Sequence, residues 1–202
     1  MSPIWSRVST AISSVAGLLP DRRVLERTIF PFLLARQQFH SILFVGCRWY
    51  TRPYTRTFRD AGKAYWTIDV DPAQRRHGAG ARHIVDGLEQ VAHHFDPGAL
   101  DAIICNGVFG WGLDARESVD QALAGSFQCL RDGGLLIVGW NETDRRSNGA
   151  AGMYAGNWAE QSATLRRFER YQFPGLETWR YHAGGPTRHV FDFFSKPDSV
   201  TV

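Results

Sequence analysis

The chain has 202 residues, 44% of them hydrophobic, and its 23 basic and 20 acidic side chains leave a formal net charge of +3. This length suits one well-buried domain and is too short for two of ordinary size. The basic residues are scattered in pairs, so the small positive charge does not indicate a nucleic-acid-binding surface. No run of about 18 apolar residues occurs, and we therefore expect no membrane-spanning helix.

The first 40 residues are predicted to form an N-terminal helical segment with a break at Leu19-Pro20-Asp21. Thr10 to Leu19 is apolar and rich in serine, with Arg7 before it, which is compatible with a targeting peptide. No small-residue cleavage site follows, and this favours an amphipathic helix that packs on the domain.

From residue 41 onward, short apolar runs alternate with amphipathic or polar ones. Such alternation predicts a Rossmann-like, doubly wound α/β fold, in which helices cover a mostly parallel sheet. The expected parallel strands are Ser41 to Val45, Tyr65 to Asp69, Arg82 to Val85, Leu100 to Cys105 and Leu135 to Trp140. The expected helices between them are Arg52 to Ala61, Pro72 to Ala79, Gly87 to Phe95 and Arg116 to Leu130.

The end of the chain departs from this alternation. Gly175 to Ala183 and Arg188 to Ser195 are both strand-like, and only four residues separate them. So short a link predicts an antiparallel hairpin, which brings the sheet to seven strands. Glycines 133 and 134 are expected to cap the preceding helix in a left-handed conformation. Asn141 to Asn157 is longer than a routine connection and is predicted to be a lid.

A glycine turn and a distant acid dominate the first half of the chain. The apolar run Ser41 to Val45 ends at Gly46, and Asp69 ends the next apolar run 23 positions later. In an α/β sheet, such a glycine lets the backbone approach an adenosine, while the carboxylate accepts hydrogen bonds from the two ribose hydroxyls. Ordinary turn chemistry is the alternative interpretation of Asp69.

Several segments, in this order, resemble the motifs of class I S-adenosylmethionine-dependent methyltransferases. They are Ile42 to Cys47, Ile68 to Pro72, Val85 to Gly87, Leu100 to Val108, Cys129 to Ile137 and Phe191 to Pro197. The resemblance implies a methyltransferase-like domain over residues 41–202 with S-adenosylmethionine as its cofactor. It implies that the cofactor-binding residues are Gly46 and Cys47 at the methionine end, Asp69 and Val70 at the ribose, Asp86 and Gly87 near the adenine amine, and Asn106, Gly107 and Val108 on the pocket floor.

The first motif departs from the family pattern. Phe44 stands in place of the usual acid, and Arg48 and Tyr50 stand in place of the later glycines. We therefore expect Thr51 or a backbone carbonyl to contact the cofactor's ammonium group.

Other sites have structural interpretations beside the functional ones. Asp71 precedes Pro72 and is predicted to be a helix N-cap. The pair Asp86-Gly87 is compatible equally with an ordinary turn and with adenine contact. The segment Asn106 to Leu113 carries three glycines and two aromatic residues, including Trp111. It is interpreted as a pocket wall, with a glycine-rich loop tucked into the core as the alternative.

These features predict a methyltransferase that acts on a small organic acceptor. The acceptor site is expected to be aromatic and apolar, built from the N-terminal helices, Trp111 and the Asn141 to Asn157 loop with its Met153 and Tyr154. The Asn-Pro-Pro-Tyr signature of enzymes that methylate nucleic-acid amino groups is missing, so no nucleic-acid partner is expected. No membrane partner is expected either, because the chain lacks a long apolar run.

The residues assign neither a catalytic group nor an oligomeric state. His182, His189 and Tyr154 are candidates for a general base, and no histidine pair has the spacing of a metal site. The odd set Cys47, Cys105 and Cys129 lies in apolar segments, which predicts buried thiols and a cytoplasmic protein.

Two other functions remain open. One is a non-catalytic binding protein with the same fold. The other is an NAD-dependent oxidoreductase, although a dinucleotide fingerprint that begins at Gly46 needs glycines at positions 48 and 51.

Overall fold

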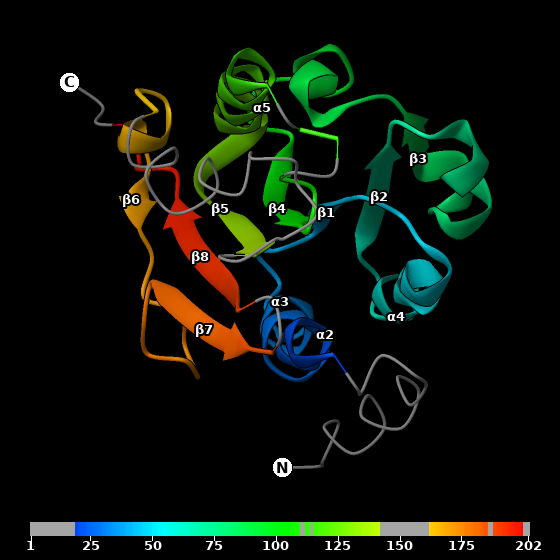
Figure 1. Cartoon of the computed structure of the whole chain (residues 1–202), viewed down its shortest axis with the longest axis horizontal. Helices are drawn as coiled ribbons and strands as arrows, with labels where there is room; N and C mark the ends of the chain where they lie inside the picture. Colours follow the sequence, from blue (N-terminus) through cyan, green and yellow to red (C-terminus); the bar gives the residue numbers. More distant parts are fainter. Residues whose placement is uncertain (1–18, 110–111, 114, 142–161, 186–187, 200–202) are drawn as a thin grey trace.

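The computed structural model describes residues 19–109, 112–113, 115–141, 162–185 and 188–199 (Figure 1). Within these ranges, eight strands form one sheet in the order β3-β2-β1-β4-β5-β8-β6, with β7 also paired to β8. The strands are β1 (Ser41–Val45), β2 (Ala64–Asp69), β3 (His83–Val85), β4 (Leu100–Asn106), β5 (Leu130–Asn141), β6 (Glu169–Arg170), β7 (Arg180–Gly184) and β8 (His189–Ser195).

The helices connect and cover these strands. They are α2 (Pro20–Val24), η2 (Leu25–Ile29), α3 (Phe30–Ala35), η3 (Trp49–Thr51), α4 (Arg52–Asp60), η4 (Pro72–His77), η5 (Gly80–Arg82), η6 (Leu88–His93), α5 (Arg116–Cys129) and η7 (Leu165–Arg167). Here η2 is a π-helical turn and the other η elements are 3-10 helices.

The predicted sheet is confirmed. Strands β1 to β5 pair in parallel, and β8 runs antiparallel to β5 and β7. The short strand β6, which pairs with the far edge of β8, was not predicted. Because parallel strands end at the same edge, the turns after β1, β2 and β4 lie side by side.

The core has two halves, one on each face of the sheet. In β1, Leu43 and Val45 pack with α5 and η6, while Ile42 and Phe44 pack with α2, α3 and α4. Successive side chains of a pleated strand point to opposite faces of the sheet, which explains this alternation. Because both faces of β1 are buried, its sequence is a continuous run of apolar residues. Figure 1 shows α5 and the α2–α3 segment on opposite sides of the sheet.

The N-terminal segment is helical from Pro20 to Ala35, and its break at Pro20 is a helix start. Pro31 has no N–H to donate to the preceding turn, and the π-helical turn lies directly before α3, where this bond is missing. The expected helix before Leu19 lies outside the described residues. Among the described residues, no helix is long and apolar enough to cross a membrane.

Three local details differ from the prediction. The segments after β2 and β3 are helical as predicted, but they form short 3-10 helices, and none of the residues of η4 is buried to support a longer helix. Strand β7 begins only at Arg180, because the preceding residues form a tight turn closed by the N–H of Phe173 and the carbonyl of Thr178 (3.0 Å).

The third concerns the end of α5. Leu130 is already extended and pairs with Leu100, so the helix ends before the glycines. Gly133, with φ +68°, instead lies where the register between β4 and β5 shifts.

A buried ion pair anchors the antiparallel strand β8. Asp192, which is 1% exposed, accepts hydrogen bonds from Arg180 Nε (2.6 Å) and Nη2 (2.9 Å) and from Trp140 Nε1 (2.9 Å). One carboxylate therefore ties β8 to both of its neighbours, β5 and β7.

Asp192→Ala leaves the Arg180 guanidinium and the Trp140 indole N–H without their buried acceptor. We expect the free energy of unfolding to fall by about 3–5 kcal/mol in urea titration. Asp60→Ala, which removes an exposed ion pair with Arg56, is the control and should leave stability unchanged. A loss below about 1 kcal/mol for Asp192→Ala would contradict the anchoring role.

Candidate functional site

A cleft lies at the carboxyl ends of the parallel strands, with about 700 Å³ of empty space, part of it open to solvent. All the predicted site residues except Cys47 line it, and Arg22, Arg48, Tyr50 and Glu89 join them. The predicted residues in its lining are Gly46, Asp69, Val70, Asp86, Gly87, Asn106, Gly107 and Val108.

Gly46 makes the turn after β1 possible. Its φ of +83° is a conformation that side-chain-bearing residues rarely adopt, and a Cβ at this position would lie 3.2 Å from Val108 Cγ2. Glycine therefore lets the β1 turn and the β4 turn approach each other at the floor of the cleft.

The Asp69 carboxylate joins the turns that follow β1 and β2. Its Oδ2 accepts from the N–H of Cys47 (2.6 Å), its Oδ1 accepts from the N–H of Asp71 (2.9 Å), and the side chain of Asp69 is 5% exposed. This is turn chemistry, yet each carboxylate oxygen has a second lone pair, so the group can accept further hydrogen bonds from a ligand. Asp71 caps η4 as predicted, with its Oδ1 accepting from the N–H of Ala73 (2.9 Å).

Cys47 takes part in the site through its backbone N–H, which donates to Asp69, and not through its thiol. The side chain is fully buried, and burial, together with the nearby Asp69 charge, raises the pKa of the Cys47 thiol to about 12. Burial likewise raises the pKa of the Cys105 thiol, on β4, to about 12. Both thiols therefore stay protonated and are poor nucleophiles.

Of the residues that replace the usual glycines, Tyr50 lies in the 3-10 helix η3 and Arg48 is its N-cap. Thr51 Oγ1 accepts from the N–H of Arg48 (3.0 Å) and donates to the Arg48 carbonyl (2.8 Å), and Thr51 is not part of the cleft lining. The expected contact of Thr51 with a ligand therefore finds no support. Arg48 Nη1 donates to the Cys47 carbonyl (2.7 Å) and lies 3.4 Å from Asp69 Oδ2.

The end of the cleft beside β3 is acidic. Asp86 Oδ1 accepts from the N–H of Gly87 (2.8 Å), and Oδ2 lies 2.9 Å from His94 Nε2, so both oxygens already have partners. Glu89 differs, because its Oε2 is buried and has no hydrogen-bond partner among the described residues. An acceptor without a donor therefore lies at this end.

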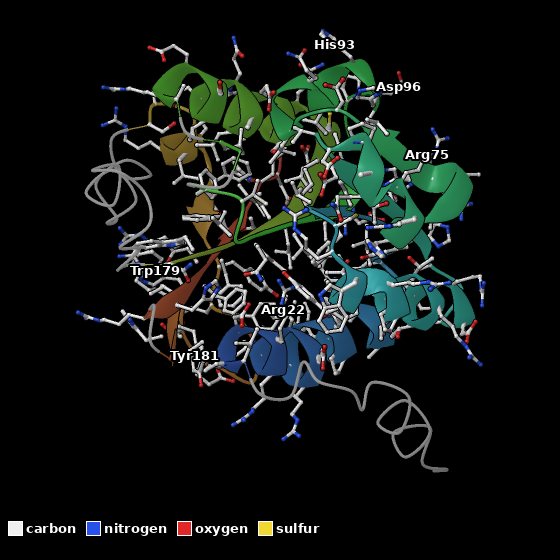
Figure 2. The ribbon with its side chains drawn as sticks, turned by 45° about the vertical axis from the view of Figure 1, so that its right-hand side comes forward. Arg22, Arg75, His93, Asp96, Trp179 and Tyr181 are labelled. Carbon is white, nitrogen blue, oxygen red and sulfur yellow. The ribbon has the colours of Figure 1, made fainter. Side chains whose placement is uncertain are left out.

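Arg22 provides a positive charge on the side of the cleft away from β3. It is 7% exposed on helix α2, and its Nη1 is buried and makes no hydrogen bond of good geometry among the described residues. Figure 2 shows its side chain between α2 and the sheet. Sequence reasoning missed both Arg22 and Glu89, since neither belongs to a recognisable motif.

A polar network closes the cleft beyond β4 and β5. Asn106 Nδ2 donates to Asp21 Oδ2 (3.2 Å), which leaves Asn106 Oδ1 as the acceptor for His189 Nε2–H (2.9 Å). Burial, with a further contribution from the Arg22 charge, lowers the pKa of His189 to about 4, so the ring is neutral. Its Nδ1 lies 2.7 Å from the side-chain Oδ1 of Asn141.

The structure separates the candidate bases. His189 is 6% exposed and engaged on both ring nitrogens, whereas His182 is exposed on β7. Trp111, Met153, Tyr154 and the lid predicted beyond Asn141 lie outside the described residues. Among the described residues, no group of histidine, cysteine and acidic side chains has the arrangement of a metal site.

The lowered pKa of His189 predicts a pH-dependent stability. The unfolded chain takes up a proton near pH 6.5 and the folded chain only near pH 4, so acid favours unfolding across this window. The stability advantage of the wild type over His189→Gln should shrink by about 2 kcal/mol between pH 7 and pH 5 in chemical denaturation. A difference that stays constant over this range would show that His189 has the same pKa in both states.

No protein-family model and no curated protein matches the chain. The chain is similar to the crystal structure of the N-methyltransferase NodS from Bradyrhizobium japonicum WM9 in complex with S-adenosyl-l-homocysteine, with 16% identity, 98% of this chain and 100% of that chain covered, and a TM-score of 0.59. A TehB-like SAM-dependent methyltransferase from Corynebacterium glutamicum has 18% identity, 95% and 94% coverage, and a TM-score of 0.57.

A third similar structure is the 1,6-didemethyltoxoflavin-N1-methyltransferase from Burkholderia thailandensis with bound 1,6-didemethyltoxoflavin and S-adenosylhomocysteine. It has 15% identity, 84% coverage of this chain and 76% of that chain, and a TM-score of 0.54. At such low identities, these similarities establish the architecture. The chain has the fold of the S-adenosylmethionine-dependent methyltransferases.

Proposed function

We propose that the chain is an S-adenosylmethionine-dependent methyltransferase that acts on a small organic acceptor. The observation that carries the proposal is the order of polar groups along the cleft. The sheet order β3-β2-β1 sets this sequence: the unpartnered acceptor of Glu89 follows β3, the Asp69 carboxylate ends β2, and the buried cation Arg22 contacts Tyr50, which follows β1. A ligand with an anionic end, a ribose and an amine-bearing base matches this order.

The residues of the cleft fit an adenosine. Asp69 is already fixed by two backbone N–H groups and lies 3.4 Å from Arg48 Nη1, and its remaining acceptor capacity can serve the ribose hydroxyls. Glu89 Oε2 can accept from the adenine amine, which relieves the penalty of a buried acceptor without a donor. Gly46 allows the backbone after β1 to approach the ligand closely.

Methyl transfer makes limited chemical demands on such a site. The bound cofactor supplies a methyl group already activated on a sulfonium. The chain then has to align the acceptor with that methyl, exclude water, and remove a proton only when the acceptor keeps it at neutral pH. Gly107 and Val108, on the floor of the cleft, would border the reacting atoms.

A small acceptor agrees with the size of the cleft and with the bound compound of one similar protein, 1,6-didemethyltoxoflavin. The basic residues among the described part of the cleft lining are Arg22, which is buried, and Arg48, which donates to the Cys47 carbonyl, so they do not form a basic surface groove. This arrangement does not favour a nucleic-acid substrate. A cytoplasmic location remains a prediction from the cysteines.

An NAD-dependent function fits less well. The dinucleotide fold has a classic strand order 3-2-1-4-5-6, whereas here antiparallel β8 lies beside β5. The positions at which phosphates would need glycines are held by Arg48 and Thr51, which bond to each other. A non-catalytic protein of the same fold would bind the cofactor without turnover.

Calorimetric titration with S-adenosylhomocysteine, S-adenosylmethionine and NAD separates these functions. The proposal predicts binding of both sulfur ligands and none of NAD. NAD binding alone would favour the oxidoreductase, and no binding of either sulfur ligand would overturn the proposal. Transfer of radiolabelled methyl groups to small-molecule extracts then distinguishes an enzyme from a binding protein.

Asp69→Ala should weaken binding of S-adenosylhomocysteine about 100-fold, because two hydrogen bonds to a charged group are lost. Asp71→Ala is the matched control, since that carboxylate is already used to cap η4. We expect it to change affinity less than threefold in the same titration. Wild-type affinity in Asp69→Ala would remove this carboxylate from the site.

Glu89→Ala should weaken binding of S-adenosylhomocysteine and of 5′-methylthioadenosine by the same factor, about 10-fold, because both ligands carry the adenine amine. Glu117→Ala, on the exposed surface of α5, is the control and should change neither affinity. Unchanged affinities in Glu89→Ala would mean that the adenine lies elsewhere.

A further inference from the structure

The guanidinium of Arg22 has only part of its hydrogen-bonding capacity satisfied. Nε lies 3.4 Å from Asp21 Oδ2, and Nη2 donates weakly to the Tyr50 hydroxyl at 3.4 Å. The cation also lies 4.6 Å from the centre of the Tyr50 ring. Nε and Nη1 are buried and make no hydrogen bond of good geometry among the described residues, although the Tyr54 side chain lies close enough to interact with the guanidinium.

Such a group is costly to leave unsatisfied. A guanidinium carries five N–H donors in a rigid plane, and a buried donor without an acceptor loses its hydration with nothing in return. Arg22 is 93% buried, since its exposed fraction is 7%, and it belongs to the lining of the cleft. Because Arg22 lines the cleft, a ligand there can offer an acceptor to this incompletely paired cation.

The position of Arg22 identifies the part of the ligand that it faces. Arg22 contacts Tyr50, which follows β1, whereas Asp69 ends β2 and Glu89 follows β3, the positions that the proposed function gives to the ribose and the adenine. The other cation there, Arg48, is half-exposed and already donates to the Cys47 carbonyl. The ligand group at this end is thus expected to be an anion that pairs with Arg22.

We propose that Arg22 binds the α-carboxylate at the amino-acid end of S-adenosylmethionine, an inference that rests on the function proposed above. A carboxylate offers two coplanar acceptors, which match the planar donors of a guanidinium. Tyr50 and Asp21 act as positioning residues, because one supports the face of the guanidinium and the other faces its Nε.

This assignment gives a role to a departure from the family motif. Tyr50 stands where the resembling family has a glycine, and in this chain its ring forms the surface on which Arg22 lies. It also places helix α2 in the cofactor site. The same helix reaches the far wall of the cleft through the hydrogen bond from Asn106 to Asp21.

Two ligands that differ only in the amino-acid end test the proposal. S-adenosylhomocysteine carries the amino-acid group, and 5′-methylthioadenosine keeps the adenosine and sulfur without it. Arg22→Met, of similar length, should weaken binding of S-adenosylhomocysteine about 10- to 100-fold and change that of 5′-methylthioadenosine less than twofold. Retained binding of the smaller ligand also shows that the variant is folded.

Arg22→Lys keeps the positive charge but loses the planar pair of N–H donors that can bind both carboxylate oxygens. Its affinity for S-adenosylhomocysteine should therefore fall between those of the wild type and Arg22→Met. Arg27→Met, which removes an exposed charge from the same helical segment, is the matched control and should bind both ligands as the wild type does. Decarboxylated S-adenosylmethionine isolates the carboxylate, and Arg22→Met should bind it with wild-type affinity.

The outcomes are distinct. If Arg22→Met loses affinity equally for both ligands, or loses affinity for neither, the proposal is overturned. No loss for either combined with a raised KM for the acceptor would assign Arg22 to an acceptor carboxylate instead. If the wild-type protein binds neither ligand, the function proposed above fails. If the wild type binds both ligands and Arg22→Met binds them equally well, only the role of Arg22 fails.

Discussion

The arrangement of the cleft depends on the Asp69 carboxylate. It accepts one N–H from the turn after β1 and another from the turn after β2, and it is almost completely buried. A buried carboxylate with hydrogen bonds to both oxygens is held in one orientation, which fixes the two turns relative to each other. Gly46, on one of these turns, then permits contact with Val108 on a third. The floor and one wall of the cleft follow from these contacts.

The departures from the family's first motif are structural substitutions with defined contacts. Arg48 and Tyr50 stand where the family has glycines: Arg48 closes a 3-10 turn with Thr51, and Tyr50 supports the buried cation of Arg22. In the proposed site, the methionine end of the cofactor is therefore bound by the Arg22 side chain of helix α2 and not by the loop after β1. The site is polarised along its length, with Arg22 on the β1 side and Glu89 on the β3 side.

The strands of the sheet were predictable because they are buried on both faces and read as short apolar runs. The terminal hairpin was predictable because its link is too short for a crossover. The ends of α5 and β7 were not, because they depend on strand register and on a tight turn set by long-range pairing.

The glycine and acid of the site stand in recognisable motifs, so their place in the cleft could be predicted. Arg22 could not, because its role depends on how α2 packs against Tyr50, 28 residues away. Glu89 is two residues from the predicted Asp86-Gly87 turn, yet only the structure shows that Asp86 is already paired with His94.

A crystal structure of the wild-type chain with S-adenosylhomocysteine tests the central claim most directly, because it shows the direction in which the ligand lies. We expect the adenine amine within hydrogen-bond distance of Glu89, the ribose hydroxyls on Asp69, and the carboxylate on Arg22. A ligand bound in the reverse direction, or outside this cleft, would contradict the account.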